Sequence, residues 1–255
     1  MAMDGLEERF SSATIREKFR RAGEQGAIIE DGDGNWSLPP PPETRYLQVK
    51  ITKDLGCGFS LRFLFRHVYE KATVPYACRA CYKVKIVPRS LRELIALRGI
   101  LESLDYHSKC GVDFYNPHSQ DWYAGFLYLD GLDEARAAYR VMRHLVDADP
   151  KLGPAVGMTI KRGCTEYEVT CGPADKYEFP EEMAAMEADL RARFKLSVVT
   201  PTDYRIRRAK SMVGWIEFAY SIKDDTYLDF TGGKRLYPAT VAFSPEDPSG
   251  RPEIS

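Results

Sequence analysis

The 255-residue sequence contains no run of about 18 or more apolar residues, the minimum for a membrane-spanning helix. Its first twenty residues also lack the uninterrupted apolar stretch of a secretory signal. Charge of one sign is not in excess, because 36 lysines and arginines stand against 37 aspartates and glutamates. The net charge of −1 provides no general basic field for nucleic acid or an anionic membrane. We therefore expect a cytoplasmic protein without a membrane partner, and the net charge does not indicate nucleic acid, so any such binding would have to be local.

Several common catalytic motifs are absent as well. The chain has four histidines, and they are too scattered to argue for a serine–histidine–aspartate set. Gly232-Gly233 lacks the glycine spacing of a phosphate-binding P-loop. Cys57 is followed by Leu61 and Leu64 where the radical-SAM spacing requires two further cysteines. These absences exclude the most easily recognised hydrolase, nucleotide and radical chemistries.

Cysteine, by contrast, is well represented, at positions 57, 78, 81, 110, 164 and 171. Structural disulfides are rare in a reducing compartment, so metal ligation, a reactive thiol or burial explains these residues better. Cys78 and Cys81 have two residues between them, a spacing shared by zinc and iron–sulfur sites. Thiolates select zinc, copper(I) and iron–sulfur clusters, which narrows the chemistry to soft metals.

The hydrophobic pattern predicts an α+β fold with a ferredoxin-like split βαβ core in the order βαββαβ. The capping pair Ser90 and Glu93 marks the start of its first helix. The predicted core strands are residues 82–87, 110–115, 122–129 and 156–161, and the predicted core helices are residues 91–104 and 132–147. A strand over residues 46–51 and a helix over residues 59–70 come before this core.

Three regions are expected along the chain. Residues 1–42 form an N-terminal appendage, with a helix over 7–22, a hairpin about the turn at 31–35 and a proline linker. Residues 43–175 hold the cysteine-bearing core. The extension over residues 176–255 begins with a helix over 180–194 and continues as a C-terminal β-meander, whose predicted strands cover 212–222, 227–230 and 236–243.

The predicted topology brings four cysteines to one sheet edge. With the strand order 4-1-3-2, Cys78 and Cys81 lie at the start of the first strand and Cys164 just past the end of the fourth. Cys110 lies at the start of the second strand, and a loop there can reach back across the third, roughly 10 Å away. We therefore predict an iron–sulfur protein, leaning towards an enzyme. Its [4Fe-4S] cluster would transfer electrons or bind substrate at an open iron.

Two other functions stay open. His107 lies three residues before Cys110, which allows a structural zinc site in a binding module for a protein or nucleic-acid partner. The Cys3His ligands of that zinc would be Cys78, Cys81, His107 and Cys110. A metal-free enzyme would instead use Cys164 or Cys171 as a thiolate nucleophile.

The loop over residues 163–172 follows the fourth predicted strand and supplies polar groups to the same edge. Tyr167 would serve as a proton donor there, and Cys171 as a reactive thiol. Arg162 would bind an anion through charge-assisted hydrogen bonds. We therefore predict Cys171, Arg162 and Tyr167 as catalytic residues, with an electron donor or a small anionic substrate as the partner.

Overall fold

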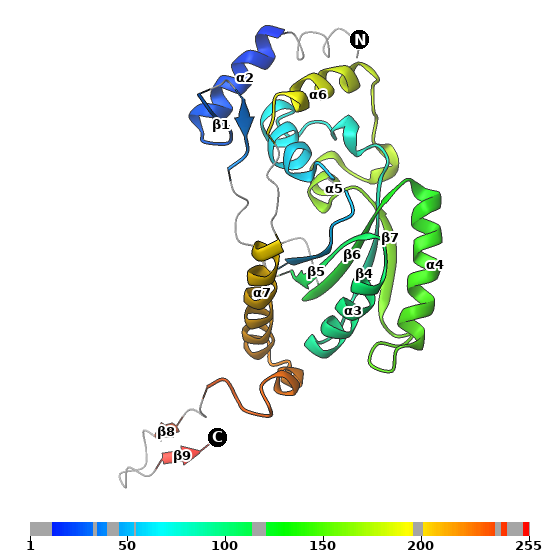
Figure 1. Ribbon diagram of the computed structural model, residues 1–255, viewed down its shortest axis with the longest axis vertical. Helices are drawn as coiled ribbons and strands as arrows, with labels where there is room; N and C mark the ends of the chain where they lie inside the picture. Colours follow the sequence, from blue (N-terminus) through cyan, green and yellow to red (C-terminus); the bar gives the residue numbers. More distant parts are fainter. Residues whose placement is uncertain are drawn as a thin grey trace.

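The structure, a computed structural model, combines helices with antiparallel β-sheet (Figure 1). It describes residues 12–32, 35–39, 46–53, 55–113, 121–195, 201–237, 241–243 and 252–254. The predicted helix and linker residues before residue 12 and over 40–42 lie outside this range, as do residues 114 and 115 of a predicted strand. In the described part of the chain, no helix is both long and apolar enough to cross a membrane.

A five-stranded sheet forms the centre of the fold. Its strands are β3 (Tyr46–Lys50), β4 (Cys81–Val87), β5 (His107–Val112), β6 (Tyr123–Asp130) and β7 (Gly157–Arg162). They lie in the order β3-β5-β6-β4-β7, and every neighbouring pair is antiparallel. Each strand lies close to a predicted one, but β5 begins three residues earlier than predicted. This shift decides where Cys110 lies.

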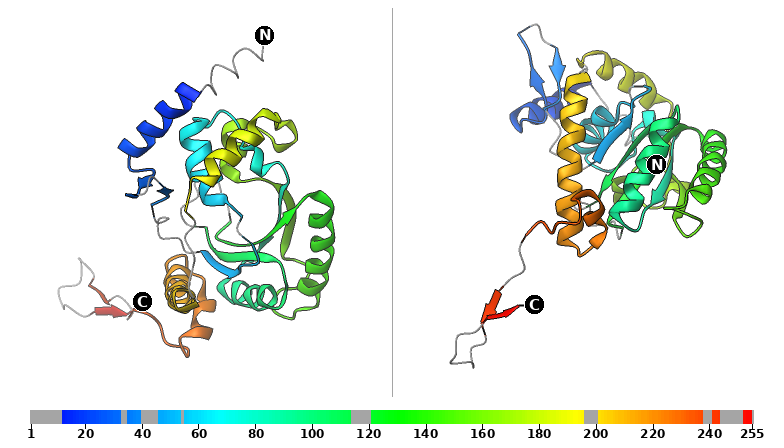
Figure 2. Two further views of the ribbon diagram at one scale, coloured as in Figure 1. Left: turned by 45° about the horizontal axis from the view of Figure 1, so that its top comes forward. Right: turned by 60° about the horizontal axis from the view of Figure 1, so that its bottom comes forward.

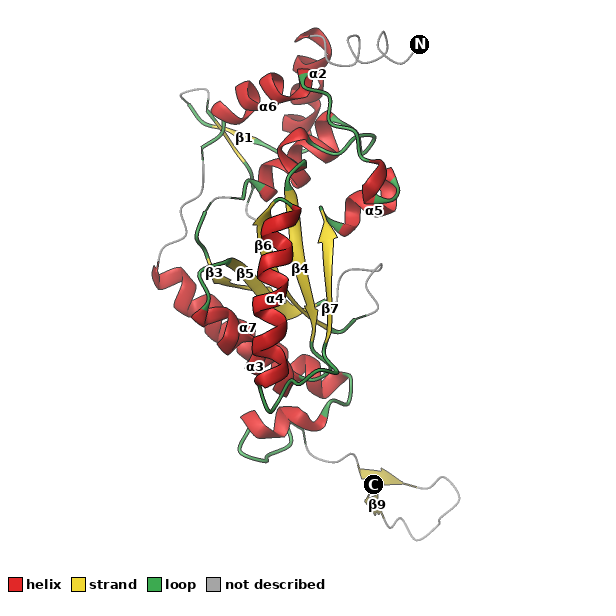
Figure 3. Cartoon of the chain, turned by 90° about the vertical axis from the view of Figure 1, so that its right-hand side faces the viewer, coloured by secondary structure: helices red, strands yellow, loops and turns green. Residues whose placement is uncertain are grey.

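One face of the sheet is covered by helices (Figure 3). These are α3 (Leu91–Ser103), α4 (Leu132–Ala148) and α7 (Pro201–Ser221). Val84 and Ile86 of β4 alternate towards this face, and Leu94 and Leu97 of α3 pack against it in the main core. At the start of α3, the Ser90 hydroxyl accepts a hydrogen bond from the backbone N–H of Glu93 at 3.3 Å, as a capping pair should.

The C-terminal meander was predicted wrongly. Residues 212–221 belong to α7, and the predicted strand over 227–230 falls in the 3₁₀ helix η4 (Asp225–Phe230). Trp215, Phe218 and Ala219 have the spacing of one helix face, and all three are buried in the main core. A short run of apolar residues fits both the two-residue repeat of a strand and the roughly 3.6-residue repeat of a helix. Here packing on the sheet selects the helix. Of the predicted strand over 236–243, residues 238–240 lie outside the described residues, and residues 236 and 237 form a bend. The last three residues form β8 (Val241–Phe243), which pairs with β9 (Pro252–Ile254) apart from the main sheet (Figure 2).

A second group of elements lies beyond one end of the sheet (Figure 1). It comprises α2 (Ser12–Glu24), the ribbon of β1 (Ile29–Glu30) and β2 (Trp36–Ser37), the π-helix η1 (Gly58–Val68), the 3₁₀ turns η2 (Tyr76–Cys78) and η3 (Ala174–Lys176), α5 (Thr165–Cys171) and α6 (Glu182–Ala192). Phe19 contacts the rings of Phe63 and Trp36, with centroids 4.8 and 4.2 Å apart. Aromatic packing therefore joins α2, η1 and the ribbon into a second core.

Candidate functional site

Four cysteines from three separate segments gather at this end of the sheet. Cys81 begins β4, and its carbonyl oxygen accepts a hydrogen bond from the N–H of Gly163 at 2.9 Å, which brings the neighbouring Cys164 to β4. Cys78 ends the turn η2 just ahead of β4. Cys57 directly precedes η1 and lies within electrostatic range of the other three thiols. We call Cys57, Cys78, Cys81 and Cys164 the cysteine group.

Local backbone geometry places two members of the group. Gly56 and Gly163 have φ angles of 61° and 67°, which residues with side chains rarely adopt, and each directly precedes a cysteine. The turns at these glycines bring Cys57 to the start of η1 and Cys164 to the start of α5. π-Helices such as η1 are rare and occur frequently at functional sites.

A buried lysine contacts the group. Lys83 is only 6% exposed, and its Nζ donates a hydrogen bond to Cys164 Sγ at 3.1 Å. The same ammonium lies 5.2 Å from the centre of the Tyr128 ring. Within the described residues, Lys83 forms no ion pair with a carboxylate. A buried ammonium needs polar or charged partners, and the sulfur of Cys164 and the ring of Tyr128 are the contacts that it makes here.

Tyr167 contacts the group from α5. Its hydroxyl lies 3.5 Å from Cys78 Sγ, and its ring packs edge-on against Phe65 of η1 with centroids 4.7 Å apart. Burial raises the pKa of the Tyr167 hydroxyl above its ordinary value. The hydroxyl is therefore protonated at neutral pH and can donate a hydrogen bond to the sulfur.

Burial also raises the pKa of the thiols. The pKa of Cys57 rises from its ordinary 9.0 to about 12, and the pKa values of Cys78 and Cys81 rise for the same reason. Without a bound cation these three residues are thiols at neutral pH and are poor nucleophiles. Metal binding here would release their protons.

The structure does not bring Cys110 to this group. Cys110 lies in the middle of β5, opposite Gly125 of β6, and is completely buried in the main core. The partner of Cys81 on β6 is Asp130, five residues from Gly125 and about 17 Å along the strand. The early start of β5 moved Cys110 from the expected sheet edge into the strand.

The Cys3His ligand set is not assembled either. His107 lies opposite Tyr128 on the face away from the helices, with ring centroids 5.5 Å apart. Residues three apart in a strand point to opposite faces, so His107 and Cys110 cannot share a metal ion. More generally, among the residues that the structure describes, no three histidine, cysteine, aspartate or glutamate side chains are grouped to hold one metal ion. The four cysteines are neighbours without forming a single-ion site.

The other two predicted catalytic residues have different surroundings. Arg162 donates to the carbonyl oxygens of Arg79 at 2.8 Å and Ala174 at 3.3 Å, and its guanidinium lies 4.8 Å from the centre of the Phe179 ring. These contacts hold the chain together rather than present an anion site. Cys171 lies at the far end of α5, about 10 Å from Cys164 along the helix. Tyr167 is therefore the one predicted catalytic residue that contacts the cysteine group.

Two residues of the site were missed by the sequence analysis. The signal for Cys57 is its position between two glycines and before an apolar helix, which indicates a special turn. Lys83 alternates with Val84 along β4, and the pattern alone places it on a polar sheet face. Nothing in the sequence marks Lys83 as buried.

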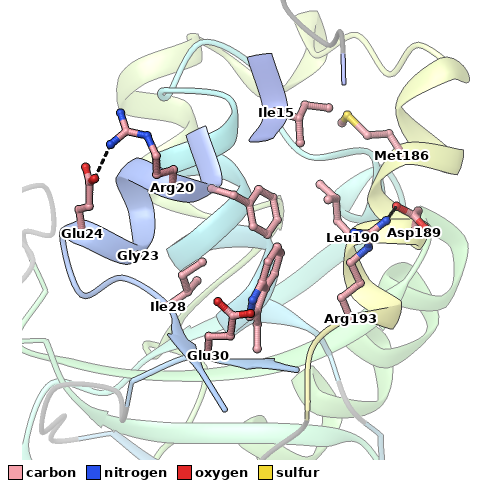
Figure 4. A pocket seen from close by; sticks show the side chains of 12 residues that line it. Ile15, Arg20, Gly23, Glu24, Ile28, Glu30, Met186, Asp189, Leu190 and Arg193 are labelled. Atoms are coloured by element: carbon pink, nitrogen blue, oxygen red, sulfur yellow. Dashed lines mark hydrogen bonds and ion pairs between the residues drawn. The ribbon is translucent and has the colours of Figure 1, made fainter. Parts of the chain in front are cut away.

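A separate cavity of about 890 Å³ lies between α2 and α6 (Figure 4). Apolar side chains of Ile15 and Leu190 line it. Charged side chains that line it pair with each other: Arg20 with Glu24, and Arg193 with Asp189. No cysteine belongs to its lining in the described structure, so the cavity is distinct from the cysteine group.

Comparison of the chain with protein-family models, curated proteins and solved structures finds no match.

Proposed function

We propose that this is an iron–sulfur protein whose [4Fe-4S] cluster is held by Cys57, Cys78, Cys81 and Cys164. It transfers electrons, or it binds a substrate at an iron that one cysteine leaves open. The observation that supports this most directly is the gathering of four partly buried thiols from the turn before η1, from η2, from β4 and from the β7–α5 loop, one of which, Cys164, contacts the buried Lys83. Cys57 takes the place that the sequence analysis assigned to Cys110.

The charges around the group suit a metal–thiolate assembly. Thiolate ligands bring negative charge into a buried region, which is unfavourable unless cations or hydrogen-bond donors lie close. Lys83 donates to the sulfur of Cys164, and Tyr167 contacts the sulfur of Cys78. Hydrogen bonds to sulfur and burial from solvent both tune the reduction potential of a cluster.

A single zinc ion and a cluster place different demands on their thiol ligands. Zinc requires four ligands at about 2.0 to 2.3 Å from one point. A cluster divides its cysteine ligands among several iron atoms, so the sulfurs lie farther apart. Among the described residues no three candidate side chains converge on one point as a zinc ion requires, so the proposal of a cluster rests on its division of the ligands among several irons.

The test is the iron, sulfide and zinc content of protein purified without oxygen, together with its visible absorption. We expect roughly four irons per chain and a broad band near about 400 nm. Alanine substitution of Cys57, Cys78 or Cys81 should lower the iron content and weaken this band. The matched controls Cys110→Ala and Cys171→Ala should retain both.

Two results would overturn the proposal. One is protein prepared without oxygen that contains neither iron nor sulfide. The other is zinc without visible colour, which would select the zinc-stabilised binding module with a different ligand set.

The contact between Lys83 and Cys164 supports a second candidate, a metal-free enzyme with a cysteine nucleophile. A neighbouring ammonium stabilises the thiolate form, which is the reactive one. In metal-free protein, iodoacetamide should then label Cys164 first, and Lys83→Met should slow that labelling. Equal labelling rates in the wild type and the variant would exclude this candidate.

We also infer that β4, α3, β5, β6, α4 and β7 form a ferredoxin-like core, with β3 as an added edge strand. Two observations support this: the order β5-β6-β4-β7 among the four strands, and the packing of α3 and α4 on one face. A crystal structure with a different strand order would reject it.

A further inference from the structure

The sheet face away from α3, α4 and α7 carries lysines and aromatic rings in cross-strand rows. In one row, β4 contributes Lys83 and β6 contributes Tyr128, followed on the outer strands by Lys161 and His107. In the next row, Lys85 and Lys109 flank Phe126. Directly opposed residues of antiparallel strands point to the same face, so these side chains share one surface. We call it the lysine face, and its members are Lys83, Lys85, Lys109, Lys161, Tyr46, Phe126 and Tyr128.

Two of the four lysines are paired with carboxylates. Lys85 contacts Asp121 at 2.6 Å, and Lys161 contacts Glu168 at 2.7 Å. Lys83 is turned to Cys164. Among the described residues, Lys109 has no carboxylate against its ammonium. The lysine face therefore holds one ammonium that neither a carboxylate nor a cysteine sulfur contacts.

Aromatic rings hold the ammonium of Lys109. It lies 4.5 Å from the ring centre of Tyr46, 5.2 Å from that of Phe126 and 5.9 Å from that of Tyr128. Rings of this kind orient a cation without neutralising it. The three rings thus fix the position of the half-buried Lys109 ammonium, and the side chain of Asp113 is hydrogen-bonded to that of Tyr46.

Lys109 also lies close to the cysteine group. Cys57 is within electrostatic range of both Lys83 and Lys109. An anion held at Lys109 would therefore lie within electrostatic range of Cys57.

We propose that Lys109, with the rings of Tyr46 and Phe126, binds a small molecule through its carboxylate or phosphate group, within electrostatic range of Cys57. As a substrate site of the cluster, this inference rests on the function proposed above. Chain-like polyanions fit less well, because a nucleic acid needs a series of exposed cations. Here the side chains of Lys85 and Lys161 are only 21% and 18% exposed, and Lys83 is buried.

Calorimetric titration of the full-length protein tests the proposal, with citrate as the carboxylate probe and inorganic phosphate as the phosphate probe. We expect at least one probe to bind, and Lys109→Met to weaken that binding by about tenfold or more, because a charge-assisted hydrogen bond is lost. The matched control Lys176→Met removes the same charge from the exposed turn η3 and should change affinity less than about twofold. Lys109→Arg should restore binding.

A second measurement does not depend on how the variants fold. In the wild type, the acetylation of Lys109, followed by mass spectrometry, should slow in the presence of the bound probe, while that of Lys176 should not. A single-stranded oligonucleotide serves as the third ligand, and tight binding of it with no binding of citrate or phosphate would overturn the proposal. So would no binding of either small anion, or equal affinity in Lys109→Met and the wild type.

Cluster content is read separately from the visible absorption and the iron assay. Protein that carries the cluster but binds no anion at Lys109 overturns the anion site alone. Protein without iron that still binds citrate or phosphate through Lys109 overturns the cluster and leaves the anion site standing.

Discussion

Glu187 of α6 is expected to hold the cysteine-bearing turn η2 in place. Its carboxylate is buried, and it accepts hydrogen bonds from the Tyr69 hydroxyl at 2.6 Å, the Tyr76 N–H at 2.7 Å and the Ala77 N–H at 2.9 Å. Tyr76 and Ala77 directly precede Cys78 in the chain. One side chain from a distant helix therefore fixes the backbone that carries a proposed ligand.

The structure sets the size of the effect. Glu187→Gln keeps the shape of the side chain but removes its charge. The amide NH2 of the glutamine then faces at least one of the donor groups from which the carboxylate accepted a hydrogen bond. A hydrogen bond to a charged group contributes about 1.5 to 3 kcal/mol, so we expect a loss of about 2 kcal/mol in the free energy of unfolding. Glu187→Ala leaves three donors without their acceptor and should cost about 4 kcal/mol.

Urea unfolding measures the loss of stability, and alkylation of Cys78 in metal-free protein measures the local effect. Burial raises the pKa of Cys78, so releasing the turn to solvent should lower that pKa and speed alkylation. Glu182→Gln, an exposed change in the first turn of α6, is the matched control and should alter neither quantity. If Glu187→Gln is as stable as the wild type and its Cys78 reacts at the wild-type rate, the positioning role is refuted.

Two further predictions concern the sheet core and the pH dependence. In Gly125→Ala the added Cβ would lie 2.6 Å from Leu97 Cδ2, so we expect a loss of about 2 kcal/mol and a Tm lower by roughly 4 to 8 °C. Gly99→Ala, in an open part of α3, should instead stabilise by about 0.5 to 1 kcal/mol, and equal Tm changes in the two variants would contradict the packing of α3 on β6. Because the folded-state pKa of Cys57 lies above its ordinary 9.0, at about 12, its contribution to stability is full below pH 9 and is lost as the pH rises towards 12. Between about pH 8 and about pH 10.5, the metal-free wild type should thus lose more free energy of unfolding than Cys57→Ala. Equal losses in the two proteins, measured by urea unfolding, would show that the pKa of Cys57 is not raised.

Local sequence patterns predicted much of the central sheet and its first two helices. Alternation over residues 82–87 and the Ser90–Glu93 capping pair depend on neighbouring residues only, and they reappear as β4 and the start of α3. Over residues 212–222 the local pattern predicted a strand wrongly, because the apolar residues there fit both a strand and a helix. The choice there was made by the burial of Trp215 and Phe218 against the sheet.

The sequence by itself determined the supply of thiols, the Cys78–Cys81 pair and the placement of that pair at the start of a strand. Tertiary structure alone decided which other cysteines join it. A three-residue change in where β5 begins moved Cys110 into the core, since strand position and facing direction depend on pairing with β6. Cys57 came to the group through the packing of η1, and Lys83 became buried because other segments cover its end of the sheet. Contacts between residues far apart in sequence leave no local pattern, which is why the approach of Cys57 to the group and the burial of Lys83 became visible only in the folded chain.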